Sequence, residues 1–519
     1  MLFRSFRVDN KSRQSVLYVG ANDGMLHAVN ASNGNELFGY IPGFVHANLN
    51  QLAKPSYGHT YYVDGSPFSA NVKVGDSWKT LLAGGANKGG KGYYMLDVTT
   101  PTANTEENSA DWVKWEFTHA DLHYSYNLPV ADRLGQARQF VRTNDNGKWA
   151  LIVGNGYPEA VNKQACLFII YVTGPSGESK AWVENTDYRK LCVGGTDYSV
   201  DGGLDTNGLS TPTPYDTNGD GKVDVIYAGD LNGNLWRFDV GSSIPGEWTA
   251  AYSGAPVFVA KNAAGTRQPI ISPPEVTTLV AGSTVGRLIL LGTGKYLEET
   301  DLTSSSTQSF YGVLDRGLSG ITRSHLAAQI LDSPETVNDV VVRRQTNKSY
   351  PAYCSTAVDL AACTTAGKNL GWYWDMPTTG ERLTGKLSLI NGVVFFNTFY
   401  PDTEAYVVDG VTKYRLDPCG YGGDGWLMGL NAVNGYMEDR FPVFDVNQDG
   451  VVDASSDAKV AGVRVGASMG GTTFAKGLTD TMVGLYSPSN KAQTDKNNKA
   501  IIKLDPASTG RVSWFELLD

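Results

Sequence analysis

A stretch near the N-terminus is repeated in the middle of the chain. Val16–Val29 reads VLYVGANDGMLHAV and Val225–Phe238 reads VIYAGDLNGNLWRF, and the two align without gaps at a constant offset. Each copy has an apolar run, a turn of Gly, Asn and Asp, and a second apolar run. This pattern predicts a β-hairpin, because those turn residues tolerate positive φ.

Related units recur along the chain. Leu427–Gly435 (LMGLNAVNG) echoes Leu26–Gly34 (LHAVNASNG). Other units, in which a strand ends in glycines and a return strand follows, are predicted at Leu81–Val98, Trp149–Val172, Arg287–Leu314 and Gly392–Val408. About six or seven such units spread over the whole chain favour an all-β propeller over an irregular β-sandwich.

The propeller is predicted to take up residues 8–519 as one domain, since all-β folds can use such a length as a single unit. Residues 300–380 break the rhythm and are interpreted as an insertion, with a Ser/Thr-rich stretch and a short helix near Ser324–Leu331. Met1–Ser5 does not resemble a signal peptide. We interpret residues 1–7 as a scar or truncated linker, and the chain as a fragment of a longer protein.

Charge and hydropathy exclude several classes of partner. The net charge is −10 and no basic stripe is visible, which argues against nucleic acid. The longest apolar runs, such as Cys166–Val172, are too short to span a bilayer, so no transmembrane segment is expected. The acidic groups are partly clustered, and this points to cations as partners.

The chain has five cysteines and no C-x-x-C pair, which argues against zinc-ribbon and thioredoxin-type chemistry. Cys354 and Cys363 could close a small disulfide ring, and Cys166 and Cys192 could tie neighbouring strands, leaving Cys419 over. Two disulfides would fit an exported protein, although the sequence alone leaves the pairing open.

The sharpest chemical motif is DTNGDGKVD, residues 216–224. Oxygen side chains fall at positions 1, 3, 5 and 9, a glycine stands at position 6, and the carbonyl of position 7 supplies another ligand. All these ligands are hard oxygens, which favours Ca²⁺ over zinc. The predicted ligands are Asp216, Asn218, Asp220, Lys222 (carbonyl) and Asp224.

Position 12 of this loop is Tyr227, where an EF-hand has a bidentate Glu. The motif is therefore an EF-hand-like loop between two strands, and tight cytosolic-type affinity is not expected. The alternative reading is a solvated Asp/Asn turn without a metal.

A second copy of the motif, DVNQDGVVD, lies at residues 445–453, within a predicted calcium-type loop at 440–460. A closing ligand could come from Ser456 or Asp457, and the alternative is a degenerate copy that folds as a bare turn. The predicted ligands are Asp445, Asn447, Asp449, Val451 (carbonyl) and Asp453.

No catalytic constellation emerges from the sequence, and the chain is not expected to be an enzyme. A G-x-S-x-G nucleophile elbow is missing. Asp230 and Asp239, which flank the hairpin after the first loop, are expected to cap turns rather than to act in acid/base chemistry.

Four segments together carry a family resemblance. DTNGDGKVDVIYAGDLNGNLWRFD (216–239), VLYVGANDGMLHAVN (16–30), GTGKYLEETD (292–301) and GRVSWFEL (510–517) resemble the C-terminal domain of PilY/PilC-type type IV pilus tip adhesins. The resemblance implies a modified seven-bladed propeller. It also implies that the loop from Asp216 to Asp224 binds calcium and that its occupancy regulates pilus extension.

The resemblance further implies pilus assembly against retraction, twitching motility and surface attachment. The expected partners are type IV pilins, minor pilins and the assembly machinery, with host or abiotic surfaces as further candidates. The expected location is extracellular, at the pilus tip or cell surface, after export through the periplasm. Some members carry an Arg-Gly-Asp motif, which this sequence lacks.

Two rival functions stay open at this point. Quinoprotein dehydrogenases are also Gly- and Trp-rich propellers, but they often carry two adjacent cysteines, and no Cys-Cys pair occurs here. The second rival is an extracellular scaffold in which calcium is purely structural.

Overall fold

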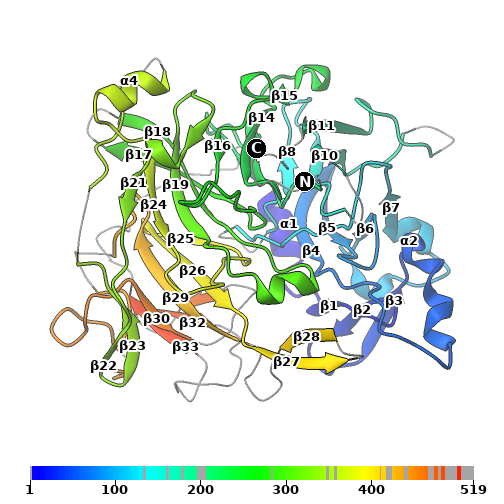
Figure 1. Ribbon diagram of the computed structural model, residues 1–519. Coiled ribbons are helices and arrows are strands. Elements are labelled where there is room, and N and C mark those ends of the chain that lie inside the picture. Colours follow the sequence, from blue (N-terminus) through cyan, green and yellow to red (C-terminus); the bar gives the residue numbers. More distant parts are fainter. Residues whose placement is uncertain are drawn as a thin grey trace.

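The computed structural model describes residues 3–132, 136–158, 162, 164–176, 180–195, 206–281, 284–346, 350–355, 359–408, 411–416, 423–437, 442–449, 451–465, 473–476, 481–485 and 499–503. The chain folds as a β-propeller, in which successive sheets stand side by side around a centre (Figure 1). The described residues form seven sheets of three or more strands and one separate hairpin.

The sheets are numbered here in chain order. The first contains β1 (Val16–Gly20), β2 (Leu26–Asn30) and β3 (Glu36–Tyr40). The second contains β4 (Phe68–Val74), β5 (Ser77–Gly85), β6 (Tyr93–Asp97) and β7 (Val113–Phe117). The third contains β8 (Phe140–Arg142), β9 (Trp149–Gly154), β10 (Gln164–Tyr171) and β11 (Tyr188–Gly194).

The fourth sheet contains β12 (Thr213–Tyr215), β13 (Val225–Gly229), β14 (Asn234–Asp239), β15 (Thr249–Ala250), β16 (Phe258–Val259) and β20 (Ile321–Thr322). The fifth contains β17 (Glu275–Ala281), β18 (Thr284–Gly292), β19 (Ser309–Asp315), β21 (Ala327–Gln329) and β24 (Gly371–Asp375).

The sixth sheet contains β22 (Glu335–Val337), β23 (Val340–Arg343), β25 (Ser388–Ile390), β26 (Val393–Tyr400), β29 (Asp424–Asn431) and β30 (Gly462–Arg464). The seventh contains β31 (Thr473–Lys476), β32 (Thr481–Leu485) and β33 (Lys499–Lys503). The separate hairpin consists of β27 (Thr403–Val408) and β28 (Val411–Leu416).

Short helices occupy some of the connections. The α-helices are α1 (Phe3–Asp9), α2 (Gly43–His46), α3 (Ser109–Trp112) and α4 (Leu360–Thr365). Single 3-10 turns are η1 (Leu49–Ala53), η2 (Pro101–Ala103), η4 (Pro245–Glu247), η5 (Tyr252–Gly254), η6 (Glu299–Thr303) and η7 (Arg323–His325). Within the part of the chain that the structure describes, no helix is both long and apolar enough to cross a membrane.

Buried apolar clusters fill the spaces between neighbouring sheets. On β9, Leu151 packs in the cluster shared with the second sheet, whereas the next residue, Ile152, packs in the cluster shared with the fourth. A strand covered on both faces needs apolar residues at consecutive positions. This explains why the central strands of the blades read as continuous apolar runs, and it places the core between the blades.

Glycines at strand ends allow the next segment of chain to pass close by. A Cβ on Gly154, at the end of β9, would lie 2.2 Å from the carbonyl oxygen of Leu209. A Cβ on Gly229, at the end of β13, would lie 2.2 Å from Cγ2 of Ile270. The glycines that recur in the repeats therefore mark places where two segments of chain approach too closely for a side chain.

The predicted repeat is confirmed, and its two hairpins share one register. Val16 pairs with Asn30 in the first sheet, and Val225 pairs with Asp239 in the fourth, at the same offset. The hairpins predicted at Leu81–Val98, Trp149–Val172 and Arg287–Leu314 are also formed.

Two local predictions are wrong. β26 does not pair with the segment after it, because β27 and β28 pair with each other and the return strand of the sixth sheet is β29. The helix expected near Ser324–Leu331 is a 3-10 turn followed by β21, which pairs in parallel with β24. In both places pairing with a distant strand decided the local conformation.

Both predicted disulfides are formed. Cys166 and Cys192 face each other across β10 and β11, and Cys354 bonds to Cys363 of α4. Cys419 lies outside the described residues, as does the GRVSWFEL segment. Residues 3–7, which were interpreted as part of a scar or linker, lie in α1 (Phe3–Asp9), whose Phe6 side chain is buried.

Candidate metal site

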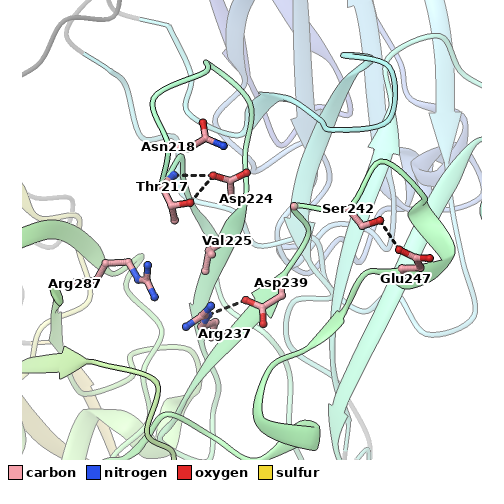
Figure 2. Close-up of a pocket in the computed structure, with 10 residues that line it drawn as sticks. Thr217, Asn218, Asp224, Val225, Arg237, Asp239, Ser242, Glu247 and Arg287 are labelled. Carbon is pink, nitrogen blue, oxygen red and sulfur yellow. Dashed lines mark hydrogen bonds and ion pairs between the residues drawn. The ribbon is translucent and has the colours of Figure 1, made fainter. Parts of the chain in front are cut away.

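The first predicted calcium loop, residues 216–224, connects β12 to β13 on the surface of the fourth sheet (Figure 2). Asp216 and Asp224 at its two ends are half-buried, whereas Thr217 to Gly221 between them are exposed. The strands on both sides fix the two ends of the loop, since β12 and β13 pair directly from Tyr215 and Val225 outward.

The loop folds back on the oxygens of alternate residues. Asp216 Oδ1, Asn218 Oδ1 and Asp220 Oδ1 each accept a hydrogen bond from the amide two residues further on, at 3.1, 2.8 and 2.9 Å. Asp216 Oδ2 also accepts one from the amide of Gly221, at 2.7 Å. Gly221 has a φ of 78°, a value at which a residue with a Cβ would be strained.

Asp224, the last predicted ligand of the loop, is held from two sides. Its Oδ2 accepts hydrogen bonds from the amide and the hydroxyl of Thr217, at 2.8 and 2.6 Å (Figure 2). Its Oδ1 accepts one from Nδ2 of Asn144, at 3.3 Å. Neither donor was predicted from the sequence. Asn144 belongs to the third sheet, and nothing in its local sequence indicates this contact.

Lys222 contributes a positive charge inside the loop. Its ammonium group lies 2.9 Å from Oδ2 of Asp220, and this hydrogen bond lowers the pKa of Asp220 below its ordinary value. A cation bound among the loop oxygens would therefore compete with Lys222 for this carboxylate.

The donor chemistry of the loop suits calcium, with three carboxylates, one amide oxygen and one backbone carbonyl, and no nitrogen or sulfur ligand. Among the residues described, no three His, Cys, Asp or Glu side chains converge into a group that could hold a metal ion. The backbone wrap thus fits a calcium loop, while the carboxylates of Asp220 and Asp224 are directed to protein donors.

The second predicted loop, between β29 and β30, is organised differently. Gly450 lies outside the described residues. Asn447 Oδ1 accepts from the amide of Asp449 at 3.0 Å, and Asp449 Oδ1 accepts from that of Val451 at 2.8 Å, as in the first loop. Asp453, in contrast, accepts from the amides of Ser455 and Ser456, at 2.8 and 2.9 Å.

A buried carboxylate organises this second loop. Asp457 accepts hydrogen bonds from the amides of Val446, Asn447 and Asp453, at 2.7, 3.2 and 2.9 Å. The hydroxyl and amide of Ser455, together with Ser456, lower the pKa of Asp453 to about 2. Asp457 was considered as a closing ligand, but its oxygens are taken up by the backbone of the loop. Asp445 also lies in this loop and is half-buried.

A cleft of about 460 Å³ lies beside the first loop (Figure 2). Its polar side chains pair with protein groups: Arg237 Nε lies 2.8 Å from Asp239, and Ser242 donates to Glu247 at 2.6 Å. It is lined by Thr217, Asn218, Asp224, Val225, Arg237, Asp239, Gly241, Ser242, Glu247 and Arg287.

The residue at position 12 of the first loop has a structural role. The hydroxyl of Tyr227 donates to the buried carboxylate of Asp315, which also lies 3.1 Å from Nη1 of Arg237. Burial alone would raise the pKa of Asp315, but the hydrogen bonds from Tyr227 and the Gly317 amide, with the charge of Arg237, hold it below its ordinary value. Position 12 is thus not available as a ligand.

Asp230, one of the two carboxylates considered for acid/base work, closes the turn between β13 and β14. Its Oδ1 accepts from the amide of Asn234 at 2.8 Å, and its Oδ2 accepts from Nε1 of Trp236 at 2.8 Å. Burial raises the pKa of Asp230, although these hydrogen bonds oppose the shift. The geometry is that of a turn cap.

The family model described as the PilY1 beta-propeller domain matches residues 2–338. The chain belongs to the PilY1 β-propeller family. Within it, the type IV pilus biogenesis factor PilY1 of Pseudomonas aeruginosa is 32% identical over 99% of this chain and 42% of its own length. A PilY1 homologue of Xylella fastidiosa is 33% identical over 82% of this chain and 26% of its own length.

The chain thus spans about two-fifths or less of these PilY1 relatives. A solved structure, the C-terminal domain of P. aeruginosa PilY1, matches with a TM-score of 0.73 and 28% identity over 97% of this chain and 95% of that one. The PilY1-type C-terminal domain and its propeller fold, expected from the resemblance, are confirmed. These relatives are named as biogenesis factors.

Proposed function

We propose that this chain is the calcium-binding propeller of a type IV pilus biogenesis factor, and not an enzyme. Two observations support the proposal. The chain belongs to the PilY1 family, whose members are named as pilus biogenesis factors. Its first loop wraps around the oxygens of Asp216, Asn218 and Asp220 in the spacing that calcium loops use.

Calcium is proposed to act as a lock on this loop. Without a cation, three carboxylates lie within nine residues, and only Lys222 offsets them inside the loop. A bound Ca²⁺ would supply two positive charges that cancel this repulsion. The exposed segment from Thr217 to Gly221 would then pass from a loosely held to an ordered state, which changes the surface beside the cleft.

The proposed ligands of the first site are those of the sequence analysis: Asp216, Asn218, Asp220, Lys222 (carbonyl) and Asp224. Modest affinity is expected, because Tyr227 occupies position 12 and is bonded to Asp315. The second loop is proposed as a weaker site, since Asp453 and Asp457 are engaged with the backbone and with Ser455.

The biological proposal follows the family. The chain would act outside the cell, at the pilus tip or cell surface, after export through the periplasm, and its two disulfides are in keeping with an oxidising compartment. Its partners would be pilins, minor pilins and the assembly machinery, together with the surfaces to which pili attach. Calcium occupancy would support pilus extension against retraction, and hence twitching motility and attachment.

Calorimetry with calcium on the wild-type chain and on Asp224→Ala tests the metal assignment. We expect wild-type binding and its loss at this site in the variant, with an unchanged circular dichroism spectrum. Glu247→Ala is the matched control, because Glu247 is an exposed carboxylate of the same cleft outside the loop. Unchanged affinity in Asp224→Ala would refute the ligand assignment.

A second experiment separates a regulatory from a purely structural role of calcium. The Asp224→Ala change is placed in the full-length gene, and pilus number and retraction are scored in cells. Loss of surface pili despite normal protein levels supports the regulatory role. Normal pili with weakened calcium binding would favour the scaffold reading.

A further inference from the structure

The end of the first calcium loop is attached to the neighbouring blade. Asn144, in the turn between β8 and β9 of the third sheet, donates from Nδ2 to the carbonyl of Val223 at 2.8 Å and to Asp224 Oδ1 at 3.3 Å. The amide of Val223 in turn donates to the carbonyl of Arg142 at 2.8 Å. Both polar groups of the Val223 backbone are therefore bonded to the third sheet.

The turn that carries Asn144 is well fixed. The amide and hydroxyl of Thr143 donate to the carbonyl of Lys148 at 2.8 and 3.0 Å. The buried carboxylate of Asp145 accepts from the hydroxyl of Tyr171 and from the ammonium of Lys148, each at 2.8 Å. A side chain on such a turn is held in place before any ligand arrives.

Packing reinforces the same contact. Val223 is buried in the apolar cluster between the third and fourth sheets, which also contains Val141 of β8. The loop end next to Asp224 cannot shift without disturbing the turn between β8 and β9.

We propose that Asn144 is a positioning residue for the calcium loop, so that calcium binding stiffens the contact between the third and fourth sheets. This inference rests on the proposed calcium function. Asn144 fixes one carboxylate oxygen of Asp224, and Thr217 fixes the other. Oδ1 keeps a lone pair for a cation, because it accepts one hydrogen bond, whereas Oδ2 already accepts two from Thr217.

The expected effect can be scaled from other metal sites. Removing a group that orients a metal ligand typically lowers affinity by about 10- to 100-fold. The 3.3 Å contact is long for a hydrogen bond, so we expect the lower end, about tenfold, for Asn144→Ala. Alanine should fit the backbone at this position, because Asn144 does not have a positive φ.

Calorimetry on the 519-residue chain tests this, with calcium alone as the probe. Asn104→Ala is the matched control: its Nδ2 also donates to a backbone carbonyl, that of Asp97, at 3.2 Å, but in the second sheet. We expect about tenfold weaker binding for Asn144→Ala and no change for Asn104→Ala. Equal affinity of Asn144→Ala and the wild type would overturn the positioning role.

Hydrogen exchange of the wild type adds a readout that needs no variant. Calcium should slow exchange of the amides of Thr143 and Lys148, although the turn contributes no calcium ligand. A merely structural Asn144 would leave their exchange rates independent of calcium, and this result overturns the inference. Absence of calcium binding by the wild type would instead overturn the proposed function and this inference with it.

Discussion

The hydroxyl of Tyr227 on β13 donates a 2.5 Å hydrogen bond to Asp315 on β19, across the boundary between the fourth and fifth sheets. The carboxylate of Asp315 is fully buried and also accepts from the hydroxyl of Tyr252 at 2.7 Å. Arg237 and Arg287 lie 3.1 and 3.6 Å from Oδ2 of Asp315, the oxygen that accepts from Tyr227. Two blades are thus joined by a charged network, whose two arginines line the same cleft as the loop from Asp216 to Asp224.

Replacing Tyr227 by Phe should weaken this contact between the two blades. Hydrogen bonds to charged groups contribute about 1.5–3 kcal/mol, so we expect Tyr227→Phe to lower the free energy of unfolding by about 2 kcal/mol. Urea titration at neutral pH measures this change in the free energy of unfolding. Tyr61→Phe, at an exposed position, is the control and should change little. A Tyr227→Phe protein as stable as the wild type would contradict this role.

The buried carboxylate of Asp315 should make the stability of the protein depend on pH. The pKa of Asp315 is lowered in the folded state, so the unfolded state binds its proton first as the pH falls. The stability that Asp315 contributes is therefore fully present above about pH 5 and is lost as the pH falls through about 4 and below. In thermal melts, the difference in Tm between the wild type and Tyr227→Phe should become smaller over that pH range. A Tm difference that stays constant from pH 7 to pH 3 would contradict this role of Asp315.

Gly154→Ala tests the close approach between blades. Its Cβ would meet the carbonyl oxygen of Leu209 at 2.2 Å, and backbone atoms on both sides resist displacement. Overpacking of this kind costs about 1–3 kcal/mol, and we expect the upper end in a denaturant titration. Gly246→Ala is the control, since nothing lies within 4 Å of its added Cβ. Equal stability of the two variants would mean that the strand-end glycines have another purpose.

Lys222→Gln should tighten calcium binding. The substitution keeps the backbone carbonyl at position 7 and removes the ammonium that competes for Asp220. An exposed ion pair contributes about 0.2–1 kcal/mol, so we expect about a threefold gain in affinity by calorimetry. Lys79→Gln, which removes a Lys–Asp pair in the second sheet, should have no effect. Weaker binding in Lys222→Gln would show that the lysine supports the site.

Local sequence patterns predicted the two aligned hairpins, of β1 with β2 and of β13 with β14, because each closes over a short turn of Gly, Asn and Asp. They failed where distant strands decide the pairing. The strand that returns beside β26 is β29, beyond the intervening hairpin, although the LMGLNAVNG echo had already marked it. The segment Ala327–Gln329 became a strand because β24 offers it a parallel edge.

The candidate site shows the same division. Oxygen spacing identified the loop from Asp216 to Asp224, since its geometry is local. The contacts of Asn144 with Val223 and Asp224 depend on how two blades meet, which no local pattern encodes. The second loop has the same oxygen spacing as the first, but its backbone is organised around the carboxylate of Asp457. Spacing alone did not predict this difference.

A structure from crystals grown in millimolar calcium most directly tests the central claim, that residues 216–224 bind calcium. We predict one ion in the first loop, with the oxygens of Asp216, Asn218, Asp220, the Lys222 carbonyl and Asp224 about 2.3–2.6 Å away. Lys222 should then have moved off Asp220. A loop that stays empty, with Lys222 still bonded to Asp220 while calcium occupies other places in the crystal, would contradict the account.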